Sequence, residues 1–308
     1  MKVFLTGATG VMGSSAIRAL HEAGHTVVGL ARSAGKAAQV ANAGAEPHRG
    51  DLYDRDTLID GMRGCDAVCN LATHVPVGSA GMTHGAWKAN DRLRTEGSRI
   101  VVEAARQAGV MKVVQQSLSF VYGDHGDDWI DEHSSIDITR YAEPIVVAES
   151  HVEEFARNDG DGVSLRFGLI TGPDGNSAWL LKRAQAGKPT GMGPREGWCH
   201  VIHPDDVGTA VAAALTVPSG VYNVGAEPIQ RKDLVDVYAQ VAGHKEGKFY
   251  GPLVMKMAGQ KVELITRSQR VSSQRFSDRT GWHPQYPKLT PDWFDALERQ
   301  QSERQQSE

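Results

Sequence analysis

The sequence predicts an α/β protein whose parallel β-sheet is covered by helices on both faces. Three observations support this prediction. Short apolar segments alternate with amphipathic segments over roughly the first 170 residues, the links between them are short, and glycines follow several of the amphipathic segments. Such alternation is typical of parallel strands joined by crossover helices. With 308 residues and 40% hydrophobic content, the chain can bury a sizeable core.

Each element has its own sequence signal. Helices are expected where apolar residues recur with helical periodicity, and Gly24 and Gly109 mark two helix ends. Strands are expected at short β-branched runs such as TVVGLA and KVVQQS. In chain order, the predicted strands are Lys2–Thr6, Thr26–Ala31, Ala45–Gly50, Asp66–Leu71, Lys112–Ser117 and Val163–Phe167. The predicted helices are Val11–Ala23, Gly35–Ala43, Asp54–Met62, Trp87–Ala108 and Glu143–Arg157.

The pattern changes after Gly168, where proline and glycine become frequent and the elements become short. We therefore expect residues 1–170 to form the main sheet domain and 171–298 to form mainly a smaller, substrate-binding unit. Segments within about 200–225 should return to the main sheet, as the helix Asp205–Leu215 and the strand Val221–Val224. The polar tail, 299–308, repeats RQQSE and is expected to be frayed or disordered.

Composition excludes several classes of function. The net charge is −4, from 33 basic and 37 acidic residues, so a nucleic-acid partner is not expected. There is neither a signal-type apolar run before the first glycines nor a stretch of about 20 apolar residues that could cross a membrane, and we expect a cytoplasmic protein with no membrane partner. Three cysteines do not suggest a disulfide framework; Cys65 and Cys69 lack further metal ligands, and we expect buried apolar cysteines and no metal site.

The segment TGATGVMG follows the first predicted strand and opens the first helix. Gly7 permits a tight turn, Gly10 lets backbone N–H groups approach a pyrophosphate, and Gly13 lets the helix pack closely on the strand. The remaining members of this loop, Thr9, Val11 and Met12, are expected to line the same site. The alternative is a purely structural glycine-rich turn, but its place between a strand and a helix predicts a dinucleotide site.

Arg32 follows the second strand, where an acidic residue would bind the 2′-hydroxyl of NAD. An arginine suits a 2′-phosphate instead, with help from Lys36, so NADP(H) is favoured over NAD(H). The alternative is a solvated arginine.

Two further segments are expected to contact the dinucleotide. Asp51, followed by Leu52, could hydrogen-bond the adenine amino group or cap a helix. Leu71, Ala72 and Thr73 end the fourth strand, where small residues would let the cofactor pass close to the backbone.

Taken together, many motifs in order resemble one family. They are TGATGVMG, GDL, NLAT, SFVYG, Tyr141 with Glu149, LRFGLITGP, HVIHPDDV and YNVG. This set, over about residues 1–290, resembles the extended short-chain dehydrogenase/reductase superfamily, also called NAD-dependent epimerase/dehydratase proteins. The resemblance implies a Rossmann-type, doubly wound sheet of seven strands, a smaller C-terminal substrate-binding domain, and a homodimer built through two long helices. It also implies that Ser117, Tyr141 and Phe167 join the cofactor-binding set.

The catalytic residues of that family are only partly present. The family serine stands four residues before the tyrosine of VYG, and here that position is Leu118, flanked by Ser117 and Ser119. The family lysine stands four residues after the catalytic tyrosine, Tyr141, and here it is Ile145. Neighbouring residues on a strand point to opposite faces, so neither serine replaces Leu118 without a bulge. The sequence is therefore identified as a divergent member.

The missing lysine favours one direction of chemistry. A phenol of pKa near 10 is seldom ionised at pH 7, so it is a poor base but a usable proton donor. We therefore expect Tyr141, if catalytic, to protonate a substrate during reduction; the alternative is an aromatic that anchors the start of a helix. Ser119 and His74 are the other catalytic candidates, although His74 also fits an ordinary loop histidine.

These features predict an NAD(P)(H)-dependent oxidoreductase that reduces a small carbonyl metabolite with NADPH. Two alternatives are a nucleotide-sugar epimerase or dehydratase, and a non-catalytic NADP(H)-binding sensor or scaffold. The segment 123–137 carries six carboxylates, which would repel a phosphorylated substrate or simply form a solvated loop.

Overall fold

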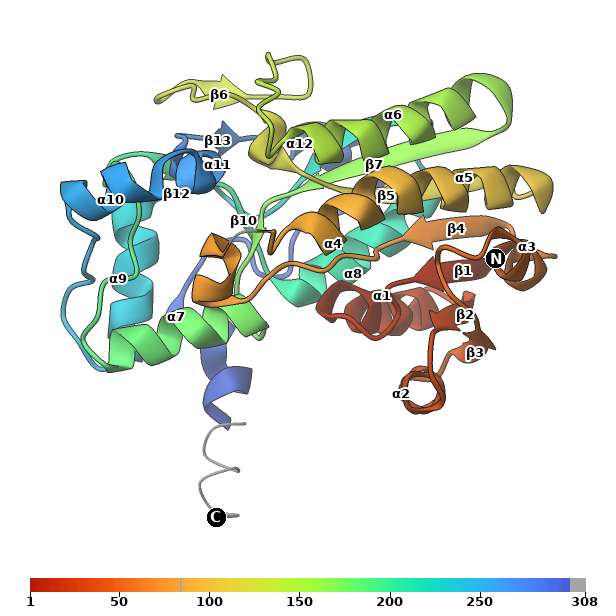
Figure 1. The fold of residues 1–308 in the computed structure, drawn as a ribbon, viewed down its shortest axis with the longest axis horizontal. Coiled ribbons are helices and arrows are strands. Elements are labelled where there is room, and N and C mark those ends of the chain that lie inside the picture. Colours follow the sequence, from red (N-terminus) through yellow and green to blue (C-terminus); the bar gives the residue numbers. More distant parts are fainter. Residues whose placement is uncertain (84, 300–308) are drawn as a thin grey trace.

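The computed structural model describes residues 1–83 and 85–299, and within them a seven-stranded parallel sheet forms the centre of the molecule (Figure 1). The strand order is β11-β7-β5-β4-β1-β2-β3, and every neighbouring pair is parallel. The strands are β1 (Lys2–Thr6), β2 (Thr26–Ala31), β3 (Glu46–Arg49), β4 (Ala67–Asn70), β5 (Lys112–Leu118), β7 (Asp161–Phe167) and β11 (Gly220–Val224). The direction of winding reverses between β1 and β4, and ligands of such sheets bind at the carboxyl ends of the strands beside that point.

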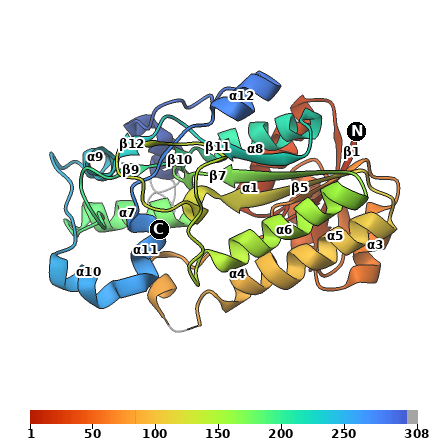
Figure 2. The ribbon, with the colours of Figure 1, turned by 90° about the horizontal axis from the view of Figure 1, so that it is seen from above.

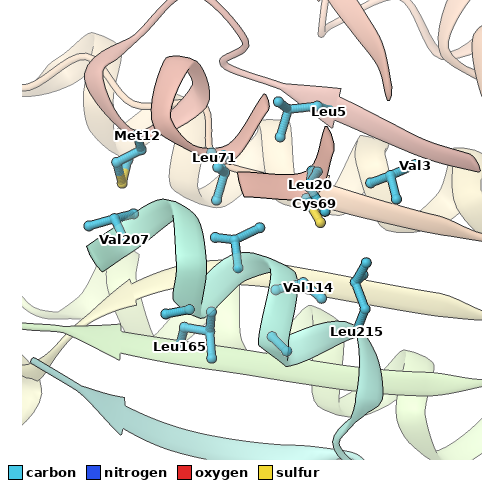
Figure 3. Close-up of a cluster of buried hydrophobic side chains, with 14 of the residues drawn as sticks. Val3, Leu5, Met12, Leu20, Cys69, Leu71, Val114, Leu165, Val207 and Leu215 are labelled. Atoms are coloured by element: carbon cyan, nitrogen blue, oxygen red, sulfur yellow. The ribbon is translucent and has the colours of Figure 1, made fainter. Parts of the chain in front are cut away.

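Helices cover both faces of the sheet, as Figure 2 shows from above. One face carries α1 (Val11–Glu22), α2 (Ala34–Asn42) and α8 (Pro204–Ala213), and the other carries α3 (Arg55–Met62), α5 (Ser98–Gln107) and α6 (Glu143–Asn158). Figure 3 shows the first of the two cores, in which Met12 and Leu20 of α1 and Val207 of α8 approach side chains of the strands. The doubly wound Rossmann-type architecture predicted from the sequence is confirmed.

The predicted elements of the first half lie within a few residues of the observed ones. The main difference concerns the long helix predicted over Trp87–Ala108. It consists of α4 (Lys88–Arg92), a π-helical turn η2 (Leu93–Gly97) and α5. A π-helical turn contains one extra residue, and such turns are frequent at functional sites.

A separate apolar core supports the expected smaller unit. It joins α7 (Gly175–Gln185) and α9 (Arg231–Val241) to aromatic residues near the end of the described chain. The α8 helix and β11 return to the main sheet as expected, but α12 (Gln274–Thr280) also packs its Phe276 into the main core. The residue boundaries of the two units stay a prediction, and of the polar tail 299–308 all but residue 299 lies outside the described residues.

The remaining elements are short. They are η1 (Gly78–Met82), η3 (Ser119–Val121), β6 (Trp129–Ile130), β8 (Leu169–Ile170), β9 (Trp198–Cys199), β10 (Val201–Ile202), η4 (Ala214–Thr216), β12 (Ile229–Gln230), α10 (Pro252–Ala258), η5 (Gly259–Val262), α11 (Glu263–Thr266), β13 (Arg270–Val271) and η6 (Pro291–Phe294). Among residues 1–83 and 85–299, no helix has the length and apolar character needed to cross a bilayer. In the same residues, no group of three or more His, Cys, Asp or Glu side chains is arranged to hold a metal ion.

Candidate functional site at the carboxyl edge of the sheet

The glycine loop between β1 and α1 is closed so tightly that it excludes side chains. Gly7 has a φ of 67°, and the Gly10 N–H donates to the Gly7 carbonyl at 2.9 Å. A Cβ at Gly7 would lie 2.6 Å from the Leu71 carbonyl oxygen, and one at Gly13 would lie 2.2 Å from the Gly7 carbonyl oxygen. Both distances are far below van der Waals contact, so these two glycines are required for the loop to adopt this shape.

The start of α1 is open to solvent. Gly10 is its N-cap and offers no side chain, and Val11 is 40% exposed although it is apolar. The N–H groups of a first helical turn have no partner within the helix, and together with the helix dipole they favour an anion. This arrangement fits the pyrophosphate of a dinucleotide. Thr9 is partly exposed in the same loop, and Met12 is buried beneath it.

The ends of β2 and β3 carry the residues expected around the adenosine. Arg32 is exposed directly after β2, and Ser33 caps α2 by accepting the Lys36 N–H. Asp51 is exposed after β3 and accepts the Tyr53 N–H at 2.9 Å. The helix that follows is capped by Asp54 and not by Asp51, so the capping alternative for Asp51 is wrong.

Leu52 and the residues after β4 form the floor of this edge. Leu52 and Leu71 are buried, and Ala72 and Thr73 are partly exposed. His74 is exposed, and its backbone N–H donates to the Asn90 side chain at 3.1 Å.

Beneath them, three polar side chains cross the sheet at the switch point. Thr6 donates to Asn70 at 2.5 Å, and Asn70 donates to Gln115 at 2.7 Å. This hydrogen-bonded row fixes the carboxyl ends of β1, β4 and β5 relative to one another.

Ser117 belongs to a buried charged network. Its hydroxyl donates to Glu149 at 2.5 Å, and Glu149 accepts two hydrogen bonds from Arg166, at 2.7 and 2.8 Å. Arg166 also lies over the Tyr122 ring, whose hydroxyl donates to Asn223 at 2.8 Å. Because the Ser117 hydroxyl is used inside the protein, its expected cofactor contact stays a prediction. Phe167, at the end of β7, is fully buried in the main core.

Ser119 lies outside the β5 strand, so strand alternation does not decide which way its side chain points. The β5 strand ends at Leu118, and Ser119 begins the short helix η3, so the alternation of faces does not extend to it. Its side chain is fully buried, and its hydroxyl has no hydrogen-bond partner among the described residues. The hydroxyl is therefore a buried polar group that no described residue satisfies.

The two positions at which the catalytic pattern is incomplete lie in one apolar cluster. Ile145, on the first turn of α6, is only 3% exposed and packs with Tyr122 and Val271. Leu118 packs against the same cluster from the end of β5. Tyr141 is half-buried in the turn directly before α6. The serine and lysine positions are thus filled together by hydrocarbon, and Tyr141 keeps its place at the start of the helix.

The acidic segment 123–137, called the strap below, is anchored to other parts of the chain through several of its side chains. Most of its carboxylates bind groups of the protein. Asp124 accepts the Ser268 N–H, Asp127 accepts from Trp198, and Asp137 pairs with Arg267 at 2.6 Å. Most of these carboxylates are nevertheless exposed, so a repelling surface and a solvated loop both stay open as interpretations of the segment.

The strap is also held by cation–π contacts with one arginine and by a short parallel pairing of two strands. Arg270 lies between the Trp129 and Trp198 rings, at 4.3 and 4.5 Å from their centroids. The strand β6 of the strap pairs with β13. The strap follows Tyr122 directly and ends four residues before Tyr141, so these contacts anchor the segment that joins the two tyrosines.

The burial of one arginine at this edge was not predicted. Arg94, in the π-helical turn, donates to Gln116 of β5 at 3.2 Å. Helical periodicity predicts that an arginine at this position is at the surface. The extra residue of the π turn changes which side chains are buried, and no sequence signal predicts a π turn here.

Comparison with known proteins agrees with this architecture. The model of the family described as "NAD dependent epimerase/dehydratase family" matches residues 3–225. A Streptomyces protein named 3-diazoavenalumate denitrifying reductase is 27% identical, covering 97% of this chain and 100% of its own. A 4-hydroxy-2-methyl-3-oxo-4-farnesyl-3,4-dihydroquinoline-1-oxide ketoreductase from Stigmatella aurantiaca is 35% identical, covering 40% of this chain and 35% of its own.

Solved structures share the fold at low sequence identity. The UDP-glucose 4-epimerase of Thermotoga maritima, with UDP-glucose, has a TM-score of 0.77 at 19% identity and covers 96% of this chain and 99% of its own. The UDP-glucuronic acid 4-epimerase of Bacillus cereus, with UDP-glucuronic acid and NAD, has a TM-score of 0.74 at 19% identity, covering 94% and 95%. At such identity the likeness establishes the fold alone.

Proposed function

Because this chain belongs to the NAD dependent epimerase/dehydratase family, we propose that it is an NADPH-dependent reductase of a small carbonyl compound. The residue pattern favours reduction over epimerisation. The two relatives reported above from the sequence comparison, from Streptomyces and from Stigmatella aurantiaca, are both named as reductases.

One observation carries this proposal: Leu118 and Ile145 fill the serine and lysine positions as parts of one apolar cluster. An epimerase first oxidises its substrate, and the base for that step needs a nearby cation to hold the phenolate. Ile145 provides no such charge. A reductase needs a proton donor instead, and a neutral phenol already is one.

The cofactor would be held by the glycine loop, with the N-terminus of α1 against its pyrophosphate and Arg32 against the 2′-phosphate. When bound, NADPH supplies the hydride that the carbonyl carbon accepts. Tyr141 would donate its hydroxyl proton to the carbonyl oxygen while its own oxygen takes a proton from solvent, so that the carbonyl becomes an alcohol and no free phenolate has to be held.

Two further side chains have supporting roles. The unpartnered Ser119 hydroxyl can donate a hydrogen bond to the same carbonyl oxygen. His74 is exposed after β4 and is available for contact with the substrate, but its side chain has no described contact that assigns it to proton transfer.

The proposal is tested with Tyr141→Phe and, as a matched control, Tyr222→Phe, whose hydroxyl donates to the Pro218 carbonyl at 3.0 Å on the far strand β11. Both variants and the wild type are titrated with NADPH and then given a panel of aldehydes and ketones. We expect Tyr141→Phe to bind NADPH normally and to lose about 100-fold or more in kcat, the usual contribution of a general acid. The control should keep its activity.

Other results contradict the proposal in distinct ways. Full turnover by Tyr141→Phe would remove Tyr141 from the chemistry. Tight NADPH binding with no turnover by the wild type would support a non-catalytic cofactor sensor. Interconversion of sugar nucleotides without net consumption of NADPH would support an epimerase.

A further inference from the structure

Arg94 is a buried cation whose guanidinium is not fully hydrogen-bonded. Its side chain is only 3% exposed, and its Nη1 has no hydrogen-bond partner. It takes part in no ion pair formed within residues 1–83 and 85–299. Two carboxylates lie within its electrostatic reach, Asp91 with the larger effect and then Glu149, and Glu149 is already paired with Arg166 at 2.7 Å. Burial lowers the pKa of the Arg94 guanidinium to about 10 even though the charges of Asp91 and Glu149 act in the opposite direction, and burial of a cation without a direct ion pair is unfavourable.

Gln116 presents a second unsatisfied donor beside the first. Its Oε1 accepts from Nη2 of Arg94 at 3.2 Å, which leaves its Nε2 pointing elsewhere, buried and without a partner. Two planar groups therefore each hold one NH2 nitrogen without a partner. A buried water could accept a hydrogen bond from either nitrogen, but it would bring no negative charge to Arg94.

The pair lies beside the proposed site of chemistry. Gln116 is two residues before Leu118 on β5, so the two side chains share one face of the strand. The π-helical turn that carries Arg94 packs on α6, the helix that follows Tyr141. Asp91, three residues before Arg94, is within electrostatic reach of Arg94 and also of Arg140, which directly precedes Tyr141.

We propose that Arg94 and Gln116 form a subsite for a carboxylate group of the substrate, which therefore is a carbonyl compound that also bears a carboxylate. This inference rests on the proposed reductase function. Two coplanar oxygens match two donors on planar groups, and a single negative charge balances the one guanidinium. A phosphate would bring a larger charge and more acceptor oxygens than the pair can serve.

The test measures binding, so it does not depend on finding the true substrate. Benzoate is titrated by calorimetry into the free protein and into its NADP⁺ complex, with benzamide as the neutral analogue of the same shape. The variants are Arg94→Met, Arg94→Lys and Gln116→Leu. The control is Arg99→Met, an exposed arginine on the same helical run that pairs with Glu103.

We expect wild type and Arg99→Met to bind benzoate at least tenfold more tightly than benzamide. Arg94→Met should lose that preference, and Gln116→Leu and Arg94→Lys should each lose part of it. NADPH affinity should be unchanged in all of them. Absence of benzoate binding by the wild type, or an unchanged preference in Arg94→Met, would overturn the inference. Failure of the reductase proposal would appear separately, as absence of turnover with binding intact.

A stability measurement gives an independent decision. If Arg94 is uncompensated, Arg94→Met removes an unfavourable buried charge, and its melting temperature should equal or exceed that of the wild type without ligand. Arg166→Met, by contrast, leaves Glu149 buried and unpaired and should melt at a lower temperature. A fall for Arg94→Met as large as that for Arg166→Met would mean that the protein itself balances Arg94, and the subsite would be rejected.

Discussion

Leu118 and Ile145 come from different elements, the end of β5 and the first turn of α6, yet their side chains meet the same apolar cluster. The family pattern has a hydroxyl and an ammonium at these two positions. Replacing only one of them would leave a polar group facing hydrocarbon, so the two replacements are physically coupled. The site has not simply lost two polar groups, because a packed interior has taken their place.

A lysine restored alone should therefore harm the protein. In Ile145→Lys, an ammonium would enter the cluster without a partner, and the free energy of unfolding should fall by about 3 kcal/mol or more. Val147→Lys, at a half-exposed position of the same helix, should cost less than about 1 kcal/mol. Urea denaturation of both variants measures the difference. Equal stability of the two would mean that water reaches position 145.

The glycine loop can be tested with two glycines of similar backbone conformation. Gly7 and Gly24 have φ values of 67° and 78°, so alanine at either adopts a strained backbone, at about 1 kcal/mol. Only at Gly7 would the new Cβ meet backbone atoms, whereas nothing lies within 4 Å of one at Gly24. Gly7→Ala should therefore lose more stability and bind NADPH at least tenfold more weakly. Gly24→Ala should bind it normally, and equal NADPH affinities would exclude the loop from the cofactor site.

Arg32 decides the preference between the two dinucleotides if it contacts the 2′-phosphate. Arg32→Ala should weaken NADPH binding by about tenfold, the value of one charge-assisted contact, and leave NADH binding unchanged. Arg63→Ala, which removes an exposed arginine from the far end of α3, serves as control. Fluorescence titration with both nucleotides gives the two affinities. If Arg32→Ala weakened the binding of NADPH and NADH equally, Arg32 would have a role other than binding the 2′-phosphate.

His200 predicts a pH dependence of stability. It is buried, both ring nitrogens lack partners among the described residues, and burial lowers its pKa to about 3. The unfolded chain takes up a proton below pH 6.5, whereas the folded state does not until about pH 3. The free energy of unfolding should therefore fall as the pH falls through this window, by up to about 1.4 kcal/mol per pH unit.

His200→Leu should flatten that slope between pH 6 and 4, as measured by denaturation at several pH values. His244→Leu, at an exposed position, is the control, because a solvated imidazole remains hydrated in both states. A slope unchanged by His200→Leu would mean that His200 is protonated within the fold or that water reaches it.

The sheet and its glycine loop could be predicted because they depend on local patterns. The strands β1 and β2 have the predicted bounds, since short β-branched runs and glycine-closed helices carry enough local signal. The positions of Leu118 and Ile145 were also predictable, because they follow from spacing within single motifs.

The rest depends on contacts between distant residues. The burial of Arg94 follows from a π turn and from packing on α6, which helical periodicity cannot express. From the sequence, the carboxylates of the strap could not be assigned any partner. In the structure, Asp124 accepts from Ser268 and Asp137 pairs with Arg267. Sequence patterns report which residues are polar, but not which polar residue will receive a partner from elsewhere in the chain.

The strap also sets an order of events in folding. Its Asp124 is bound by the backbone of Ser268, a residue 144 positions later in the chain. Closing so long a loop is entropically costly and comes late, whereas β1, β2 and β4 can pair with near neighbours. The sheet strands from β1 to β7 and the glycine loop can therefore pair while the last third of the chain, which supplies the edge strand β11, is still being synthesised. The wall beside Tyr141 becomes rigid only when that last third arrives, so competence to bind a nucleotide should precede competence to act on a substrate.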